Sequence, residues 1–279
     1  MSENFLTVEN LSFKFPKAKD FMFKNLNFSF PIDQDIIVIL GSNGTGKSLL
    51  AQLLVGLQKI HSGSIKYFDQ ELTKLSTSER IKYISLTFQM VNKSFIKDTV
   101  EQELLFALNL REKNTKHVKQ VDDFTETFPL IKNSLKDKHP LKLSGGEKRL
   151  LTLQLIDITN PEIIILDEPT VGLDFFHIQE LIKLIHYLKS KKKKIIVITH
   201  DLKFLLSICD YCILLEKDKS DDLRSITYQG SLMDLLLNNF NLANSILSIP
   251  IEFILFREKV LNKEFESITD YQTYLKNYM

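Results

Sequence analysis

The octapeptide GSNGTGKS at residues 41–48 constrains this chain more than any other stretch, because it fits the pattern G-x-x-x-x-G-K-[ST] at every fixed position. The apolar run IIVIL leads into it, and the helical pattern KSLLAQLLVGL follows. Glycines let a backbone turn its N–H groups inward around phosphate oxygens, and the start of a helix adds further donors. A plain turn needs only one glycine, so the octapeptide predicts a phosphate-binding loop. Its predicted binding residues are Gly41, Ser42, Asn43, Gly44, Thr45, Gly46, Lys47, Ser48 and Leu49.

A pair of acidic residues supplies the chemistry that such a loop requires. Asp167 and Glu168 end an apolar run that begins at Ile163, and ligands bind at the carboxyl ends of parallel strands. We expect Lys47 to reach the β- and γ-phosphates, and Ser48 to ligate Mg²⁺ together with the water shell held by Asp167. Glu168 is expected to polarise an attacking water. The alternative is an acidic pair that only caps a helix.

The order of the apolar runs predicts an α/β fold. Continuous β-branched runs at 36–40, 82–88, 163–166, 195–199 and 211–216 indicate strands that are buried on both faces, as in a parallel sheet covered by helices. The first thirty residues alternate apolar and polar side chains, which predicts antiparallel strands. The residues between Phe88 and Pro161, and those after Gly230, have helical patterns. We therefore expect a helical insertion and a small helical C-terminal piece.

The stretch LSGGE at residues 143–147 places two glycines side by side in a chain that has only nine. Ser144 and bare backbone N–H groups at the start of a helix would form an anion site, and glycine keeps side chains away from the anion. Six of the nine glycines fall in this stretch, in the phosphate loop and in VGLD at 171–174. This concentration indicates that glycine is kept for phosphate contact.

A phosphate loop, then LSGGE, then a strand ending in Asp-Glu, in this order, resembles an ABC ATPase. The resemblance implies a P-loop NTPase (RecA-like) core with ATP and Mg²⁺ as cofactors. It implies a nucleotide-binding domain over residues 1–229, with a helical subdomain inserted at about 90–158, and a C-terminal helical segment at 230–279. It also implies that two chains sandwich two ATP molecules. The signature residues that would face the partner's nucleotide are Leu143, Ser144, Gly145, Gly146 and Glu147.

Four further positions match motifs of that family one by one. Gln89 stands where the Q-loop glutamine senses Mg²⁺ and the γ-phosphate, and Asp174 where the D-loop crosses the dimer. His200 resembles the histidine that contacts the γ-phosphate, although a histidine at a strand end is also compatible with a structural role. Phe15 matches the aromatic residue that stacks on adenine, with Phe13 as the competing choice.

Glu147 departs from the family pattern, which usually has glutamine at this position of the signature. A carboxylate near the triphosphate would weaken the closed sandwich, and an inactive site is the alternative to a tolerated variant.

Looser similarities indicate a particular branch of the family. DTVEQELLFALNL at 98–110 and the tail from residue 243 resemble the energy-coupling factor (ECF) importers and their cobalt and nickel relatives. The resemblance implies partners: a second ABC ATPase, identical or related, an integral membrane coupling subunit and a small substrate-binding membrane protein. It implies a peripheral position on the cytoplasmic face of a bacterial membrane. A conventional importer or exporter, and an ABC ATPase without a transport role, remain alternatives.

Composition limits the other classes of function. The net charge is +1, so nucleic acid is not an expected partner. The sequence has no apolar run near the roughly 18 residues that a membrane-spanning helix needs, and its start does not resemble a signal peptide. Cys209 and Cys212 have no second ligand pair, which favours buried apolar cysteines over a zinc or redox site.

Overall fold

The computed structural model describes residues 3–87, 95–112, 133–209, 211–218, 222–244, 247, 249 and 251–262. Within these residues the strands form one sheet with the order β5-β4-β1-β2-β10-β9-β3-β8-β7-β6. The strands are β1 (Asn4–Phe13), β2 (Phe23–Pro31), β3 (Ile36–Leu40), β4 (Ser62–Tyr67), β5 (Gln70–Glu71), β6 (Ile84–Thr87), β7 (Ile163–Asp167), β8 (Lys194–Ile198), β9 (Tyr211–Lys217) and β10 (Arg224–Ser231).

The β-branched runs form the parallel half of the sheet, as the sequence predicts. β9, β3, β8, β7 and β6 are neighbours and all run in the same direction. Successive side chains of a strand point to opposite faces, and β3 serves two cores: Val38 belongs to one apolar cluster, and Ile37 and Ile39 to the other. These strands are therefore apolar throughout because both faces are covered.

The alternating N-terminal stretches form the antiparallel half. β1 pairs with β2 and with β4 in antiparallel fashion, which confirms the expectation from alternation. β10 pairs antiparallel with β9 and meets β2 through Arg224 and Phe23. The two halves therefore form one continuous sheet.

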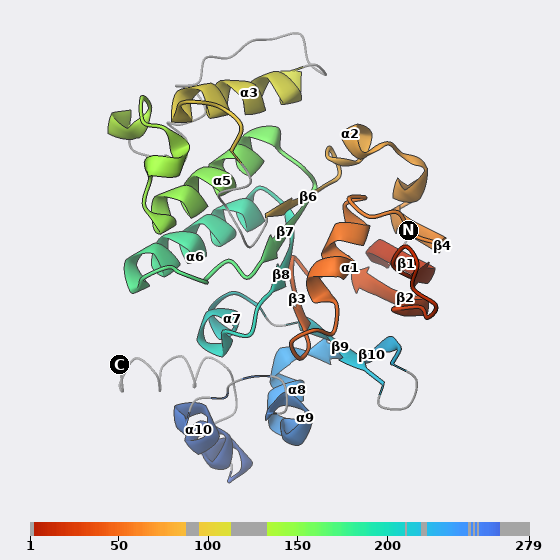
Figure 1. Cartoon of the computed structure of the whole chain (residues 1–279). Coiled ribbons are helices and arrows are strands. Elements are labelled where there is room, and N and C mark those ends of the chain that lie inside the picture. The colour runs from red at the N-terminus through yellow and green to blue at the C-terminus, as the bar shows by residue number, and fades with distance from the viewer. Residues whose placement is uncertain are drawn as a thin grey trace.

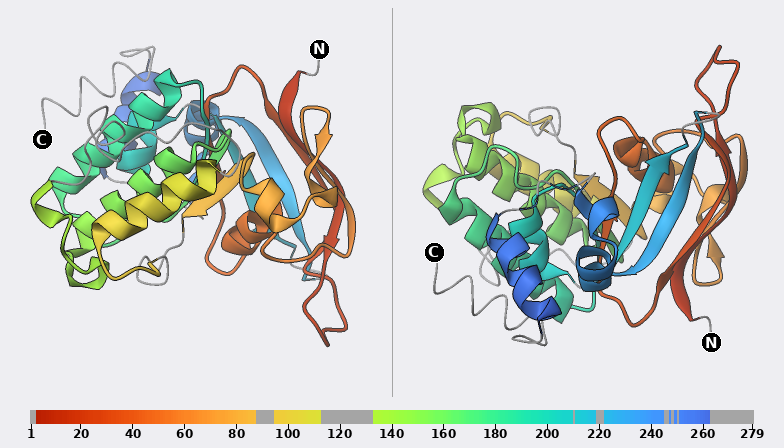
Figure 2. Two further views of the ribbon diagram at one scale, coloured as in Figure 1. Left: turned by 90° about the horizontal axis from the view of Figure 1, so that it is seen from above. Right: turned by 90° about the horizontal axis from the view of Figure 1, so that it is seen from below.

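Helices cover both faces of this sheet (Figure 1). α1 (Lys47–Leu54) packs in the apolar cluster that also contains β1 and β2. α5 (Gly145–Thr159), α6 (Phe175–Ser190) and α7 (Leu202–Ile208) pack in the cluster on the other face. Figure 2 shows these helices on one side of the strands and α1 on the other. A P-loop NTPase core of this kind agrees with the predicted fold class.

α3 (Val100–Glu112) lies in the stretch with a helical pattern and packs beside α5. The short helix α2 (Thr77–Arg80) precedes β6, outside the stretches for which the sequence predicts helix. α8 (Leu232–Asn238), α9 (Phe240–Asn244) and α10 (Ile251–Leu261) form the C-terminal part. In the described part of the chain, the helices are all too short or too polar to cross a bilayer. Cys209 and Cys212 are both buried, as predicted, and each is a thiol that takes no part in a disulfide.

Candidate functional site: a phosphate loop beside two carboxylates

The phosphate loop joins β3 to α1 in a conformation that depends on glycine. Gly44 has φ +81° and Gly46 has φ +96°, values that residues with a side chain rarely adopt. Gly46 is the N-cap of α1, and neither a capping side chain nor an acidic residue occupies the first turn of this helix. The free N–H groups and positive end of the α1 dipole are thus available to an anion.

Lys47 lies inside the loop. Its Nζ donates to the carbonyl oxygens of Gly41 at 2.7 Å and Ser42 at 3.0 Å. Burial lowers the pKa of Lys47, and the nearby carboxylates of Glu168 and Asp167 oppose this effect. The loop therefore holds a partly desolvated cation at the place where a phosphate would sit.

Asp167 ends β7 and faces the loop from the neighbouring part of the sheet. Its side chain is hydrogen-bonded to Ser48, and its backbone N–H donates to the Thr87 hydroxyl at 3.3 Å. Burial raises the pKa of Asp167 above its ordinary value, and the charge of Glu168 adds to the effect. The Oδ1 atom of Asp167 is buried without a hydrogen-bond partner.

Such an orphaned carboxylate oxygen beside a serine hydroxyl is a donor set that suits Mg²⁺, which takes oxygen ligands and needs few of them from the protein. The residues present therefore fit the metal that the sequence predicts.

Glu168 has a backbone conformation that the sequence does not reveal. Its φ is +46°, in the left-handed region that costs a non-glycine residue about 1–2 kcal/mol. Its N–H donates to the Ile198 carbonyl at 2.8 Å, and its Oε1 lies 3.0 Å from His200 Nδ1. The other oxygen, Oε2, is buried without a partner. Strain of this kind is concentrated at functional sites, and here it fixes the direction of a carboxylate.

These groups line one polar cavity of about 310 Å³. The loop from Asn43 to Leu49, without Thr45, and the two carboxylates are far apart in sequence but line this one cavity. Gly41, Ser42 and Thr45 do not line it. Sequence reasoning missed two apolar lining residues, Met22 and Ile198. Ile198 directly precedes Thr199 and His200 at the end of a predicted strand, and this position in the sequence could have indicated that it lies near the site. The sequence around Met22 has no feature that indicates this. The lining consists of Met22, Asn43, Gly44, Gly46, Lys47, Ser48, Leu49, Asp167, Glu168 and Ile198.

The signature stretch is not part of that lining. Ser144 caps α5: its hydroxyl accepts from the Glu147 N–H at 3.2 Å, and the Glu147 carboxylate accepts from the Ser144 N–H at 2.8 Å. The latter bond lowers the pKa of Glu147. The unexpected carboxylate thus points back to its own helix start, where glutamate is a usual partner of serine, and Leu143 is buried beside it.

Asp174 caps α6 in the same manner. Its Oδ1 accepts from the backbone N–H of His177 at 2.9 Å, and the side chain remains largely exposed. The bond lowers the pKa of Asp174. The residue is therefore held in place and is also accessible to another molecule.

The two candidates for adenine stacking differ in exposure. Phe13 is 3% exposed and belongs to the core, whereas Phe15 is 48% exposed and packs edge-on against Phe13 at 5.2 Å between ring centroids. Only Phe15 has a face available to a base, although it does not line the cavity described above. Gln89 lies outside the described residues.

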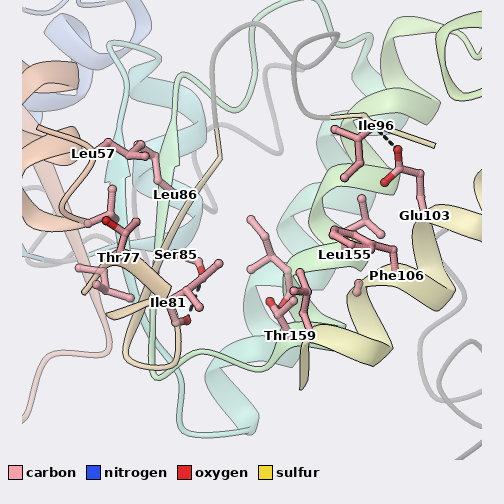
Figure 3. Close-up of a pocket in the computed structure, with 15 residues that line it drawn as sticks. Leu57, Thr77, Ile81, Ser85, Leu86, Ile96, Glu103, Phe106, Leu155 and Thr159 are labelled. Carbon is pink, nitrogen blue, oxygen red and sulfur yellow. Dashed lines mark hydrogen bonds between the residues drawn. The ribbon is translucent and has the colours of Figure 1, made fainter. Parts of the chain in front are cut away.

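A second, apolar pocket of about 260 Å³ lies between the sheet and α3. Figure 3 shows Ile81 and Leu86 on one wall, and Phe106 and Leu155 on the other. Glu103 lines it too, with its carboxylate accepting the N–H of Lys97 at 2.6 Å. The carboxylate of Glu103 therefore accepts hydrogen bonds from the chain's own backbone, and the rest of the pocket lining is mainly apolar.

Comparison with known proteins gives consistent matches. The sequence model of the ABC transporter family matches residues 23–171. The chain is 31% identical over 261 residues to YkoD of Bacillus subtilis, which carries the provisional name of HMP/thiamine import ATP-binding protein; the match covers 92% of the chain and 45% of YkoD. The chain spans less than half the length of YkoD and of the Bacillus relatives that match alongside it.

Solved structures share the fold. CbiO1 of Clostridium perfringens, part of the ABC transporter complex CbiONQ, superposes with a TM-score of 0.68 at 24% identity, over 86% of this chain and 96% of CbiO1. A bacterial ABC transporter cassette solved as a dimer superposes with a TM-score of 0.66 at 19% identity, over 81% of this chain and 98% of the cassette.

Proposed function

Because the chain belongs to the ABC transporter family, we propose that it binds ATP with Mg²⁺ and hydrolyses it to drive transport across a membrane. One observation carries the proposal: a phosphate loop with a half-buried lysine and two carboxylates with unpartnered oxygens line the same cavity. The negatively charged phosphates of ATP would bind to the N–H groups of the loop and the positive end of the α1 dipole. The metal ion of ATP would be held by Ser48 and by water molecules bound to Asp167.

The residues of the chain have separate roles in this proposal. Lys47 and the N–H groups of the loop bind the β- and γ-phosphates, and these donors are already oriented before the nucleotide binds. Glu168 orients the attacking water and accepts its proton at the carboxylate, while His200 holds that carboxylate at 3.0 Å. Bound Mg²⁺ supplies neutralisation of the phosphate charge.

The catalytic site is proposed to be complete only when two chains meet. Ser144 and its neighbours form a polar helix start, yet they are absent from the lining of the chain's own phosphate cavity. A second cassette, identical or related, would bring its signature to the γ-phosphate. The similarity to a cassette that was solved as a dimer supports this arrangement.

The partner on the membrane side is proposed to dock in the apolar pocket between the sheet and α3. Its walls come from two parts of the chain, so movement of α3 and α5 relative to the sheet would change the pocket. A short apolar helix of an integral membrane subunit fits such a surface. The chain would then be peripheral, on the cytoplasmic face of the membrane.

An ECF-type importer of a vitamin or a metal ion is the proposed assembly. The name of YkoD mentions HMP/thiamine import, and CbiO1 belongs to a CbiONQ complex; both support this branch over a conventional importer. Native membranes solubilised in mild detergent test the assignment. We expect the tagged chain to bring down a second ABC ATPase, one coupling protein and a small membrane protein. Recovery of one type of polytopic permease instead would contradict the ECF assignment.

Phosphate release by the purified chain tests the ATPase proposal itself. We expect Lys47→Ala to abolish turnover because the loop loses its cation, and Glu168→Gln to abolish it because the water loses its base. Lys24→Ala removes an exposed lysine on β2 and serves as the matched control. Full activity of Glu168→Gln would show that another group acts as the base.

A further inference from the structure

His177 occupies the space beside the second glycine of the signature. A Cβ atom added to Gly146 would lie 2.5–2.6 Å from Cδ2, Cγ and Nε2 of the His177 ring. By contrast, a Cβ on Gly145 would meet only the Gly172 carbonyl oxygen, at an ordinary 3.8 Å. The need for glycine at position 146 therefore comes from the chain's own histidine, in addition to any approach of a phosphate.

The same ring is fixed from its other side. His177 Nδ1 lies 2.8 Å from Oδ1 of Asp174, the same oxygen that accepts the His177 backbone N–H. The backbone bond alone would cap α6, so the bond to the ring is an additional constraint. It holds the imidazole between Asp174 and the first turn of α5.

These contacts join two segments that are separated by about thirty residues in sequence. Gly145 approaches Gly172, and Gly146 packs against His177, so the signature and the loop before α6 share one surface. The signature is proposed to face the partner's nucleotide, and Asp174 stands where the chain would cross the dimer, so both segments belong to the face that meets a second chain. An error in the position of either segment would misplace the groups that reach across to the partner.

We propose that His177 is a positioning residue that couples the Asp174 loop to the signature helix, so that both segments meet a second chain's ATP as one unit. This inference deepens the proposed function and rests on it. His177 does not line the phosphate cavity of its own chain. It acts on closure of the dimer and leaves the first binding step unchanged.

The test uses the full chain in a Glu168→Gln background and measures ATP-dependent dimerisation by light scattering. We expect His177→Ala to weaken dimerisation by tenfold or more, while affinity for a fluorescent ATP analogue changes less than twofold. His177→Asn keeps a donor near the position of Nδ1 and is expected to recover part of the loss. In the otherwise unmutated chain, His177→Ala should lower kcat with little change in KM. His186→Ala, an exposed histidine on the same helix, is the matched control.

A double-mutant cycle separates coupling from loss of folding. Gly146→Ala forces a contact with the ring, so combining it with His177→Ala should cost less than the two single changes together. Additive losses, or equal dimerisation of His177→Ala and its parent, would overturn the inference. If the Glu168→Gln parent fails to dimerise with ATP, the proposed function itself is contradicted.

Discussion

Replacement of Asp167 by asparagine should make the nucleotide-free protein more stable while it abolishes ATP turnover. Asp167 is buried, and its Oδ1 has no hydrogen-bond partner. Leaving a buried polar or charged group without a partner costs about 1–3 kcal/mol. Asparagine keeps a polar atom at this position but removes the charge, whose burial is the larger cost. The Ser48 hydroxyl, Lys47 and Arg149 offset part of this penalty, so we expect a gain of about 1.5 kcal/mol at neutral pH from removal of the charge.

The gain should depend on pH with a defined sign. Burial raises the pKa of folded Asp167 above 3.8, so the folded protein holds this proton more tightly than the unfolded chain does. The contribution of the residue to stability is therefore fully present below pH 3.8 and is lost as the pH rises through the folded-state pKa. The difference between Asp167→Asn and the unmutated chain should be large at pH 8 and shrink toward acid pH.

Urea unfolding without nucleotide and without Mg²⁺ measures this difference. With a slope of about 3 kcal/mol/M, a gain of about 1.5 kcal/mol moves the midpoint upward by about 0.5 M. Asp174→Asn is the matched control, because its bond to the His177 N–H lowers the pKa of Asp174. That contribution is present above the unfolded-state pKa and is lost as the pH falls, so the control should be destabilised at pH 8. An Asp167→Asn variant that is less stable than the unmutated chain at pH 8 would refute the reasoning.

Three paired substitutions test other parts of the site. Gly41→Ala places a Cβ against the backbone carbonyl oxygen of Leu215 and should lower the free energy of unfolding in urea by more than about 2 kcal/mol. The Cβ of Gly44→Ala meets nothing within 4 Å, so this variant should lose only about 1 kcal/mol, from the strain of its positive φ. Equal losses would contradict the packing argument. Phe15→Ala should weaken the binding of adenine nucleotides with little loss of stability, because this ring is exposed. Phe13→Ala should lower the free energy of unfolding by about 3–5 kcal/mol, because this ring is buried. An unchanged nucleotide affinity of Phe15→Ala would contradict the stacking role. Glu147→Gln should keep the capping interaction and strengthen ATP-dependent dimerisation, because it removes a charge near the triphosphate. Glu147→Ala should lose about 1 kcal/mol of stability in the same unfolding assay, because the capping interaction is lost. Weaker dimerisation of Glu147→Gln would contradict this.

The elements with strong periodic patterns could be predicted from the sequence. Runs such as 36–40 and 195–198 are apolar at every position because both faces of the parallel strands are buried, and the structure pairs them as β3 and β8. The alternation in β1 and β2 reflects a strand with a less buried face, and these strands are antiparallel. The phosphate loop and the Asp167–Glu168 pair could be predicted because their motifs impose fixed spacings.

Other features depend on contacts that no local pattern encodes. The left-handed φ of Glu168 is accompanied by a bond from its N–H to Ile198, thirty residues later. Met22 lines the cavity with its side chain beside Gly46, and its carbonyl oxygen accepts the N–H of Arg224 at the start of β10. The packing of His177 on Gly146 requires α5 and α6 to be neighbours. The sequence predicts that glycine is needed in the signature, but a local reading assigns the reason to phosphate alone.

The assembly state of the Glu168→Gln chain tests the central claim, that two chains complete each ATP site, most directly. Light scattering coupled to size-exclusion chromatography would be recorded with Mg²⁺ and ATP, and again without nucleotide, with bound nucleotide quantified in each peak. Without ATP we predict a monomer, and with ATP a dimer that carries two nucleotides. The double variant Glu168→Gln/Lys47→Ala should stay monomeric in the presence of ATP. A monomer that binds ATP at every protein concentration would contradict the shared site.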